Sequence, residues 1–173
     1  MALPQAKILV CIAGREVRLR ITGRASFASG PDFQTLVNEL YQQGYRCFRI
    51  DMSECVLMDS TFLGLICGLG LKLRDAREPD AGVELLNPNP RLTELLESLG
   101  ICAVVKVRQD PSERWELEAT SATPSSAPTR EDMARTSLEA HQTLMSLSPD
   151  NQMRFKDVVQ FLAEDLKRLK QQT

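Results

Sequence analysis

The sequence contains a single histidine, His141, and only 5% aromatic residues in 173 positions. Its five cysteines are Cys11, Cys47, Cys55, Cys67 and Cys102, and no two of them form a CxxC pair. Metal sites in proteins need several Cys, His or carboxylate ligands at characteristic spacings, and this sequence shows no such spacing. We therefore expect no metal and no cofactor, and we expect reduced thiols in or beside apolar segments.

The sequence also has nearly balanced charge and no long apolar run. Lys and Arg total 21 and Asp and Glu total 23, which gives a net charge of -2. Without a strongly basic surface, binding to nucleic acid is not expected. The apolar run at residues 61–71 is much shorter than the roughly 20 residues that cross a membrane, and the N-terminus lacks signal-peptide features. We therefore expect a cytoplasmic protein without membrane insertion, with protein or small-molecule partners.

Strand-like and helix-like segments alternate over the first 107 residues, which predicts an α/β fold. Apolar patterns predict strands at residues 7–13, 17–22, 47–51, 82–86 and 101–107. Helical periodicity predicts helices at residues 33–45, 60–77 and 90–100. This order favours a mostly parallel or mixed β-sheet with helices packed on it. In the second strand the polar positions include Arg18 and Arg20, which we expect on a solvated edge.

Beyond residue 107 the composition changes. Residues 108–128 are rich in Ser, Thr, Ala and Pro, which predicts a flexible linker with Trp115 as its candidate anchor. Residues 129–173 predict a helical hairpin, because Thr129 and Ser148 each begin an N-capping pattern. We expect this C-terminal helical extension to dock on its own domain, on a second copy of the chain or on a partner. The chain is thus divided into residues 1–107, 108–128 and 129–173.

The segment CVLMDSTFLGLICGLGLKLRD, residues 55–75, places Asp59 and Ser60 directly before an apolar helix. Asp59 is a suitable N-cap, since its carboxylate can accept hydrogen bonds from the first helical turn. One residue suffices as a cap, so Ser60 needs another explanation, as a nucleophile or as a switchable hydroxyl. The helix contains glycines that each cost up to about 1 kcal/mol relative to Ala, which close packing on the sheet should offset. These glycines are Gly64, Gly68 and Gly70.

A nucleophilic role for Ser60 has little support in the sequence. There is no G-x-S-x-G motif, and His141 lies beyond the predicted linker, where a residue on a helix face is the ordinary interpretation. The segment GLGLKL also lacks the spacing of a phosphate-binding loop. The hydrolase hypothesis predicts turnover of an activated ester that is lost in Ser60→Ala and in His141→Ala.

The same region resembles the STAS domain of bacterial anti-sigma-factor antagonists. In that family a strand ends in D-x-S, and after a hydrophobic stretch a D-S-S/T-G-L-G motif starts a helix rich in small residues. The matching residues are Asp51 and Ser53 for the first motif and Asp59, Ser60, Thr61, Leu63 and Gly64 for the second. The order of elements and the segment PRLTELLESLGI agree as well, so the resemblance covers about residues 7–107.

The resemblance implies a STAS-like fold and a non-enzymatic regulatory role in transcription. In the family the first Ser of the second motif is phosphorylated by a partner kinase, so Ser60 is the expected phosphorylation site. The expected partner is an anti-sigma factor or a related serine-kinase-like regulator. The residues expected in the partner-binding switch loop are Asp59, Thr61, Phe62, Arg24 and Ser53. Phe62 stands where the family has Gly, and residues 23–27 lack the Asp that relatives carry after the second strand.

A second hypothesis is a constitutive scaffold or transporter-associated STAS subunit. In that case Phe62 acts as a hydrophobic anchor, and the C-terminal helices build a homo-oligomer. Replacing Ser60 by Asp separates the two hypotheses, because it abolishes partner binding only where Ser60 is a switch.

Overall fold

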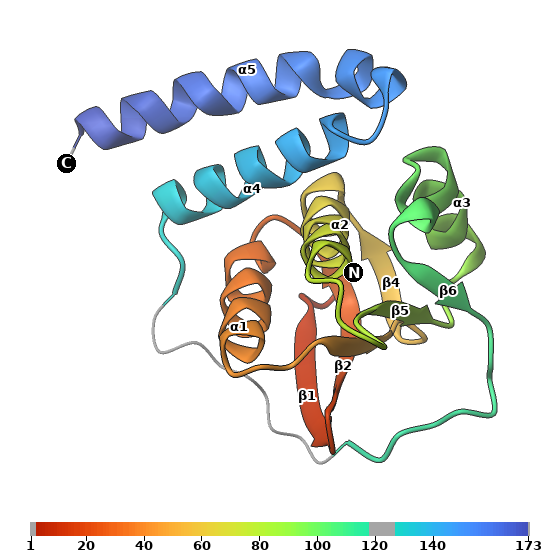
Figure 1. Cartoon of the computed structure of the whole chain (residues 1–173). Helices are drawn as coiled ribbons and strands as arrows, with labels where there is room; N and C mark the ends of the chain where they lie inside the picture. Colours follow the sequence, from red (N-terminus) through yellow and green to blue (C-terminus); the bar gives the residue numbers. More distant parts are fainter. Residues whose placement is uncertain (1–2, 118–126, 173) are drawn as a thin grey trace.

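The computed structural model describes residues 3–117 and 127–172, and Figure 1 shows how their elements are arranged. The described strands are β1 Lys7–Ala13, β2 Glu16–Ala25, β3 Cys47–Asp51, β4 Cys55–Met58, β5 Gly82–Leu86 and β6 Lys106–Arg108. The described helices are α1 Gly30–Gln42, α2 Ser60–Asp75, α3 Pro90–Ser98, α4 Arg130–Met145 and α5 Pro149–Gln171, with a 3-10 turn at Ile101–Ala103. The predicted α/β fold with C-terminal helices is confirmed.

The strands form one mixed sheet in the order β1-β2-β3-β5-β6. β1 and β2 are an antiparallel hairpin, and the other pairs are parallel. β2 is long enough to pair with two strands in succession, because residues 16–20 pair with β3 and residues 23–25 pair with β4. The sequence analysis did not predict β4, since four residues are too few to show a periodic pattern. Its formation depends on the end of β2.

α1 and α2 lie side by side over the sheet, α4 crosses above them, and α5 stacks on α4 (Figure 1). The apolar side chains of β2 that were predicted to face the core, Val17, Leu19 and Ile21, are completely buried. Phe33 of α1 and Phe62 of α2 are also completely buried and belong to the same core. The core therefore holds α2 firmly, and with it the residues at its start.

The polar face of β2 is covered rather than solvated. Cζ of Arg18 lies 5.3 Å from the ring centroid of Trp115, and Cζ of Arg49 lies 5.4 Å from it. The carbonyl of Trp115 accepts a hydrogen bond from Arg20 at 2.9 Å. The expected solvated edge is wrong, because β2 lies inside the sheet between β1 and β3, and the segment after β6 folds back over it.

Two other boundaries differ from the expectation. The predicted linker, 108–128, begins with residues docked on the sheet, and its residues 118–126 lie outside the described part of the chain. The last predicted strand begins later than expected: Gly100 adopts a left-handed φ of 77°, the 3-10 turn follows, and only β6 is extended. A left-handed glycine after a helix reverses the chain direction, which delays the strand.

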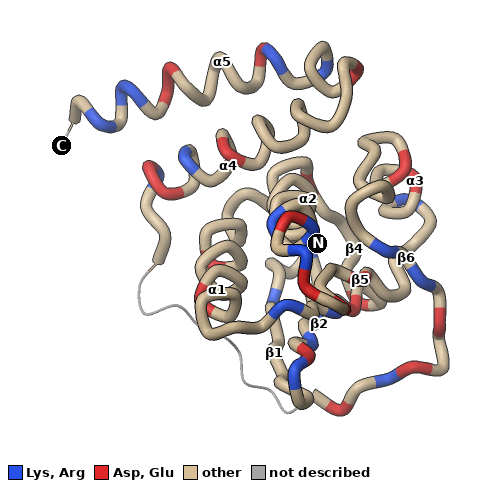
Figure 2. The backbone as a smooth tube through the Cα atoms, viewed as in Figure 1, with Lys and Arg blue, Asp and Glu red and all other residues tan. Residues whose placement is uncertain are grey.

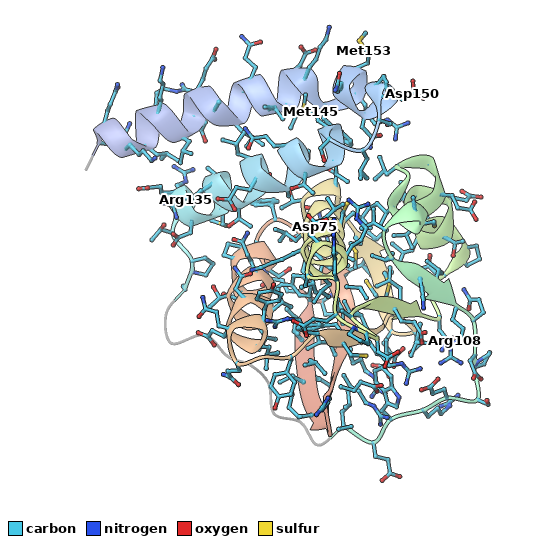
Figure 3. The ribbon with its side chains drawn as sticks, viewed as in Figure 1. Asp75, Arg108, Arg135, Met145, Asp150 and Met153 are labelled. Carbon is cyan, nitrogen blue, oxygen red and sulfur yellow. The ribbon has the colours of Figure 1, made fainter. Side chains whose placement is uncertain are left out.

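A network of carboxylates and guanidinium groups lies beside Trp115. Arg49 pairs with both carboxylate oxygens of Glu113, at 2.6 and 2.9 Å, and Arg108 pairs with Glu113 as well. Figure 2 shows the alternating charges of this segment, and Figure 3 labels Arg108 at β6. The hydrogen bonds from Arg49, and then those from Arg108 and Trp115, lower the pKa of Glu113 to about 2.

This network should make the folded protein sensitive to acid. Because folding lowers the pKa of Glu113 from 4.5, its stabilisation is present above that pH and is lost as the pH falls towards 2. Glu113→Gln should remove this part of the pH dependence of the free energy of unfolding, measured with urea between about pH 2 and 6. Glu94→Gln, on the exposed face of α3, is the control and should keep the wild-type slope. Equal slopes in the two variants would contradict the role of Glu113.

Candidate functional site

Asp59 caps α2, as predicted from the sequence. Its backbone is extended, with φ of -86° and ψ of 172°, and its Oδ1 accepts a hydrogen bond from the N–H of Phe62 at 3.0 Å. Its Oδ2 accepts a hydrogen bond from the N–H of Phe27 at 2.7 Å. Phe27 belongs to the loop between β2 and α1, so one carboxylate joins this loop to the start of α2. Asp59 thus fills the capping role without help from Ser60.

Ser60 is the first residue of α2, and its hydroxyl contacts the C-terminal extension. Ser60 Oγ lies 2.8 Å from Nε2 of His141 in α4. The other ring nitrogen of His141, Nδ1, lies 2.7 Å from the carbonyl oxygen of Ser137. A carbonyl oxygen can only accept, so Nδ1 carries a proton, and in the neutral imidazole Nε2 then accepts the hydrogen bond of the Ser60 hydroxyl. Ser60 is half-buried and His141 is buried, so this hydroxyl is held between two helices.

Thr61 makes a second contact of the same kind. Its Oγ1 lies 2.8 Å from Oγ of Ser137, and both side chains are buried. Consecutive hydroxyls at the start of α2 are therefore both paired with α4. This pairing accounts for two hydroxyls at a helix end that Asp59 already caps.

The glycines of α2 provide the space for α4. A Cβ atom at Gly64 would lie 2.4 Å from the carbonyl oxygen of Ala140, so only glycine fits there. At Gly68 the nearest atoms belong to Thr143, at 3.9 Å, which leaves room for a methyl group. The expectation that these glycines approach the sheet is wrong, because positions four apart share one helix face and this face meets α4. Gly70 instead faces the connection that precedes β6.

Phe62 does not lie on the surface. Its side chain is fully buried, and its ring centroid is 4.7 Å from that of Phe33 in α1. Two residues after Ser60 the helix has turned by about 200°, so position 62 faces the core when position 60 faces α4. The expectation that Phe62 contacts a partner, as part of the switch loop or as a hydrophobic anchor, is therefore wrong for this conformation.

Arg24 and Ser53 lie apart from the Ser60 hydroxyl. Arg24 is exposed on β2, opposite Leu57 of β4. Ser53 is exposed in the turn before β4, where its N–H donates a hydrogen bond to Asp51 at 2.9 Å. The four residues of β4, about 13 Å in length, separate Ser53 from the start of α2. The structure therefore does not bring the two motif serines together.

The sequence analysis missed Ser137 and Phe27 as residues of this site, and it placed His141 beside Ser60 only in the hydrolase hypothesis. The interpretation of His141 as an ordinary helix-face residue is wrong, because its ring contacts Ser60 across 81 positions of sequence. No local motif marks that contact, which arises only when α4 docks on α2. Phe27 is 50% exposed beside Asp59. Its only signal in the sequence was an aromatic residue within a predicted loop.

A contact between Ser and His is also the geometry of a nucleophile and its base. Here a backbone carbonyl orients the imidazole, and the cavity beside the pair is lined by Thr61 and Ser137 rather than by Ser60 or His141. This cavity has a volume of ≈ 430 Å³, and its other lining residues are Phe27, Arg130, Met133, Ala134, Leu162, Asp165 and Leu169. The Ser60 hydroxyl itself lies at a helix N-terminus, where negative charge is stabilised.

The described residues offer no metal site and no membrane span. Within 3–117 and 127–172, no group of three His, Cys, Asp or Glu side chains could hold a metal ion. In the same residues, every helix is too short or too polar to cross a membrane. Burial raises the pKa of the Cys55 and Cys67 thiols to about 11, so both are protonated at neutral pH.

The Ser60–His141 hydrogen bond should contribute measurably to docking of α4. In a double-mutant cycle with Ser60→Ala and His141→Ala, we expect a coupling energy of about 1 kcal/mol in the free energy of unfolding measured with urea. Ser98→Ala, on the exposed face of α3, serves as the control partner for His141→Ala and should give no coupling. A Ser60–His141 coupling no larger than the control coupling would contradict the contact.

Comparison with known proteins places this site in a family. The family model described as "Mlab, STAS domain" matches residues 8–106. The anti-sigma factor antagonist SpoIIAA in its unphosphorylated form is 18% identical, with a TM-score of 0.54 over 61% of this chain and 89% of that chain. SpoIIAA of Bacillus in its phosphorylated form is also 18% identical, with a TM-score of 0.51 over 61% of this chain and 92% of that chain.

A putative anti-sigma factor antagonist from Thermotoga maritima is 18% identical, with a TM-score of 0.52 over 61% of this chain and 87% of that chain. At such identities the likeness shows the fold alone. A comparison with curated proteins gives no match. The family match ends before α4, so His141 and Ser137 lie outside the matched residues. The matched residues span more than half of the chain, and the protein belongs to the STAS domain family.

Proposed function

We propose that this chain is a regulatory protein-binding module and that phosphorylation of Ser60 switches its binding to a partner. The observation that carries the proposal is the division of roles at the start of α2. Asp59 caps the helix with one oxygen and holds the neighbouring loop with the other, so the Ser60 hydroxyl is available for another role at the same helix end. The similar structures include SpoIIAA in an unphosphorylated and a phosphorylated form, which supports this role.

A phosphate on Ser60 should change binding more than it changes folding. It adds about -1.5 to -2 charges at neutral pH. The N-terminus of α2 stabilises such a charge by about 0.3 to 1 kcal/mol, so the STAS domain itself tolerates it. At a partner interface, a cost of only about 4 kcal/mol for an unpaired phosphate weakens affinity a thousandfold. The proposed switch therefore acts on association.

The proposed partner is a serine-kinase-like regulator of the anti-sigma-factor type, in the cytoplasm, where ATP is available. The surface around the start of α2 supports binding by such a protein, because Phe27, whose N–H bonds to Asp59, is 50% exposed there. Asp59 contributes charge to this surface, and the exposed Arg24 lies farther along β2, opposite Leu57. Thr61 would join the surface only after α4 moves away. Phe62 is no longer included, since it belongs to the core.

The proposal predicts one phosphate on Ser60 in protein isolated from its native cells, located by peptide mass mapping. Ser60→Asp should weaken capture of the regulator about 100-fold or more, because the added charge lies in the interface. Ser53→Asp is the matched control and should leave binding close to wild type, since Ser53 lies at the other end of β4. A phosphate found only elsewhere, together with equal binding by both variants, would overturn the switch.

A second candidate function, a constitutive scaffold that forms homo-oligomers, is favoured by the outer face of α5. Val158 is 40% exposed and Phe161 is 59% exposed on this face. With Arg154 and Asp165 they form a stripe at spacings of 4, 3 and 4 residues. In an antiparallel pair of such helices, each Val158 meets Phe161 of the other copy and each Arg154 meets Asp165. Figure 3 shows Met153 pointing outward from the same helix, and Met153 is 69% exposed.

The scaffold candidate predicts a dimer whose molar mass is measurable by light scattering. Phe161→Glu should shift the dimer to a monomer, because it places an unpaired charge against the apolar Val158 of the other copy. Arg154→Asp alone should weaken the dimer, and the double variant Arg154→Asp, Asp165→Arg should restore it. Gln152→Glu, on an exposed position outside the stripe, is the control. A monomeric wild-type chain at high concentration would remove this candidate.

A further inference from the structure

The α2 face that begins at Ser60 is covered by another part of the same chain. Three contacts hold α4 on this face: the Ser60 hydroxyl to His141, the Thr61 hydroxyl to Ser137, and the backbone of Gly64 against that of Ala140. These contacts follow one another along α2, on the face formed by positions 60, 61, 64 and 68. Together they make a continuous helix-on-helix interface that masks both hydroxyls.

The α4–α5 hairpin, residues 130–171, behaves as one cover because its two helices are locked together. Asn151 Nδ2 donates hydrogen bonds to the carbonyl of Leu144 at 2.8 Å and to the carbonyl of Leu99 at 2.9 Å. Phe155 of α5 packs its ring edge-on against the imidazole of His141, with centroids 5.3 Å apart. The hairpin therefore carries its own internal contacts, and it docks on the STAS domain through buried side chains that join the common core, among them Ala140 and Leu144.

The docked hairpin also contains an unsatisfied polar atom. Within the described residues, Oδ1 of Asn151 is buried without a hydrogen-bond partner, although the same side chain joins the hairpin to the end of α3. A buried acceptor without a partner regains hydrogen bonds with water when the interface opens. Its solvation on opening offsets part of the cost of breaking the hydrogen bond from Asn151 Nδ2 to Leu99.

We propose that the α4–α5 hairpin is an intramolecular cover of Ser60, and that it must undock before Ser60 can be modified or the α2 face can bind a partner. This inference rests on the proposed function, in which Ser60 is the switch. The uncovered face fits a partner helix with a small residue opposite Gly64, because α4 shows the Ala140 backbone in van der Waals contact there.

Phosphorylation and docking of the hairpin exclude each other on geometric grounds. A kinase would transfer the γ-phosphoryl group of a nucleoside triphosphate to Ser60 Oγ, forming one P–O bond and breaking the bond to the diphosphate, while the hydroxyl proton passes to the kinase's base. In the docked state Oγ is 2.8 Å from His141 Nε2, with Ser137 and Phe155 packed around the imidazole. A phosphate on Oγ would have to take the position that the His141 ring holds in the docked state. Modification would therefore also prevent the hairpin from docking again.

The cover can be tested with a thiol placed at the masked position. In full-length Ser60→Cys, the rate of alkylation by N-ethylmaleimide is measured for each cysteine by peptide mass mapping. Two native cysteines are internal references: Cys102 is exposed, and Cys55 is buried on β4, away from the α2 face, and reports global unfolding. We expect the introduced thiol to react about tenfold or more slowly than Cys102, and faster than Cys55.

A matched pair of glycine variants then opens the cover or leaves it in place. Adding Gly64→Ala should raise the alkylation rate of the introduced thiol about tenfold or more, because its Cβ collides with the Ala140 carbonyl, while Cys55 stays protected. Adding Gly68→Ala should leave that rate unchanged, because 3.9 Å to Thr143 leaves room for the methyl group. No kinase is present, so the result does not depend on whether Ser60 is phosphorylated.

Three results would overturn the cover. The first is an introduced thiol that reacts as fast as Cys102 in the parent protein. The second is a Gly64→Ala variant with no change in the rate. The third is exposure of Cys55 together with the introduced thiol, which would mean that the hairpin does not open separately from the STAS domain. Failure of the phosphorylation proposal would instead appear only in the mass mapping of Ser60 from native cells.

Discussion

The close approach of α4 to α2 at Gly64 is the constraint on which the rest of the site depends. Because Gly64 has no side chain, the backbone of Ala140 can lie directly against α2. This approach places His141 and Ser137, on the same side of α4, within hydrogen-bond distance of the two hydroxyls that start α2. A larger residue at position 64 would separate the helices and leave Ser60 and Thr61 without these partners. One glycine thus decides whether the hydroxyls are masked.

Asp59 has the complementary role of keeping the helix start intact in either state. Its two oxygens serve the N–H groups of Phe62 and Phe27, and neither contact involves α4. The first turn of α2 and the neighbouring loop can therefore keep their conformation when the hairpin leaves. Phe62, packed on Phe33, anchors the same turn to the core. The start of α2 is thus held in place by contacts within the STAS domain. The proposed movement is confined to the α4–α5 hairpin that covers it.

Much of the fold could be predicted from the sequence, because most of its elements have a local cause. The alternation in β2, the cap at Asp59 and the capping box at Thr129 each involve residues within a few positions of one another. The burial of Phe62 was also accessible, since Phe62, Ile66, Leu69 and Leu73 repeat at helical spacing and all are buried. Because Phe62 stands within the family motif, it was predicted to be exposed for partner binding, although its helical spacing indicates burial.

The features that could not be predicted depend on contacts between distant segments. β4 exists because the end of β2 extends past β3, and the covered face of β2 depends on Trp115, which lies 95 positions after Arg20. The contact of Ser60 with His141 joins a STAS domain to an extension that the family pattern does not include. No periodicity or spacing in one segment encodes where another segment docks. For this reason the sequence pointed to Ser60 as a candidate site, but it did not predict that the α4–α5 hairpin docks over it.

The central claim is that α4 and a phosphate compete for the same hydroxyl. The most direct test is hydrogen exchange of the backbone amides in the full-length protein, compared with and without phosphoserine incorporated at position 60. The account predicts that the amides of α4 and α5 lose protection in the phosphorylated protein, while the sheet and the core-facing part of α2 keep theirs. Equal protection of α4 in both forms would show that the hairpin accommodates the phosphate, and it would contradict the account.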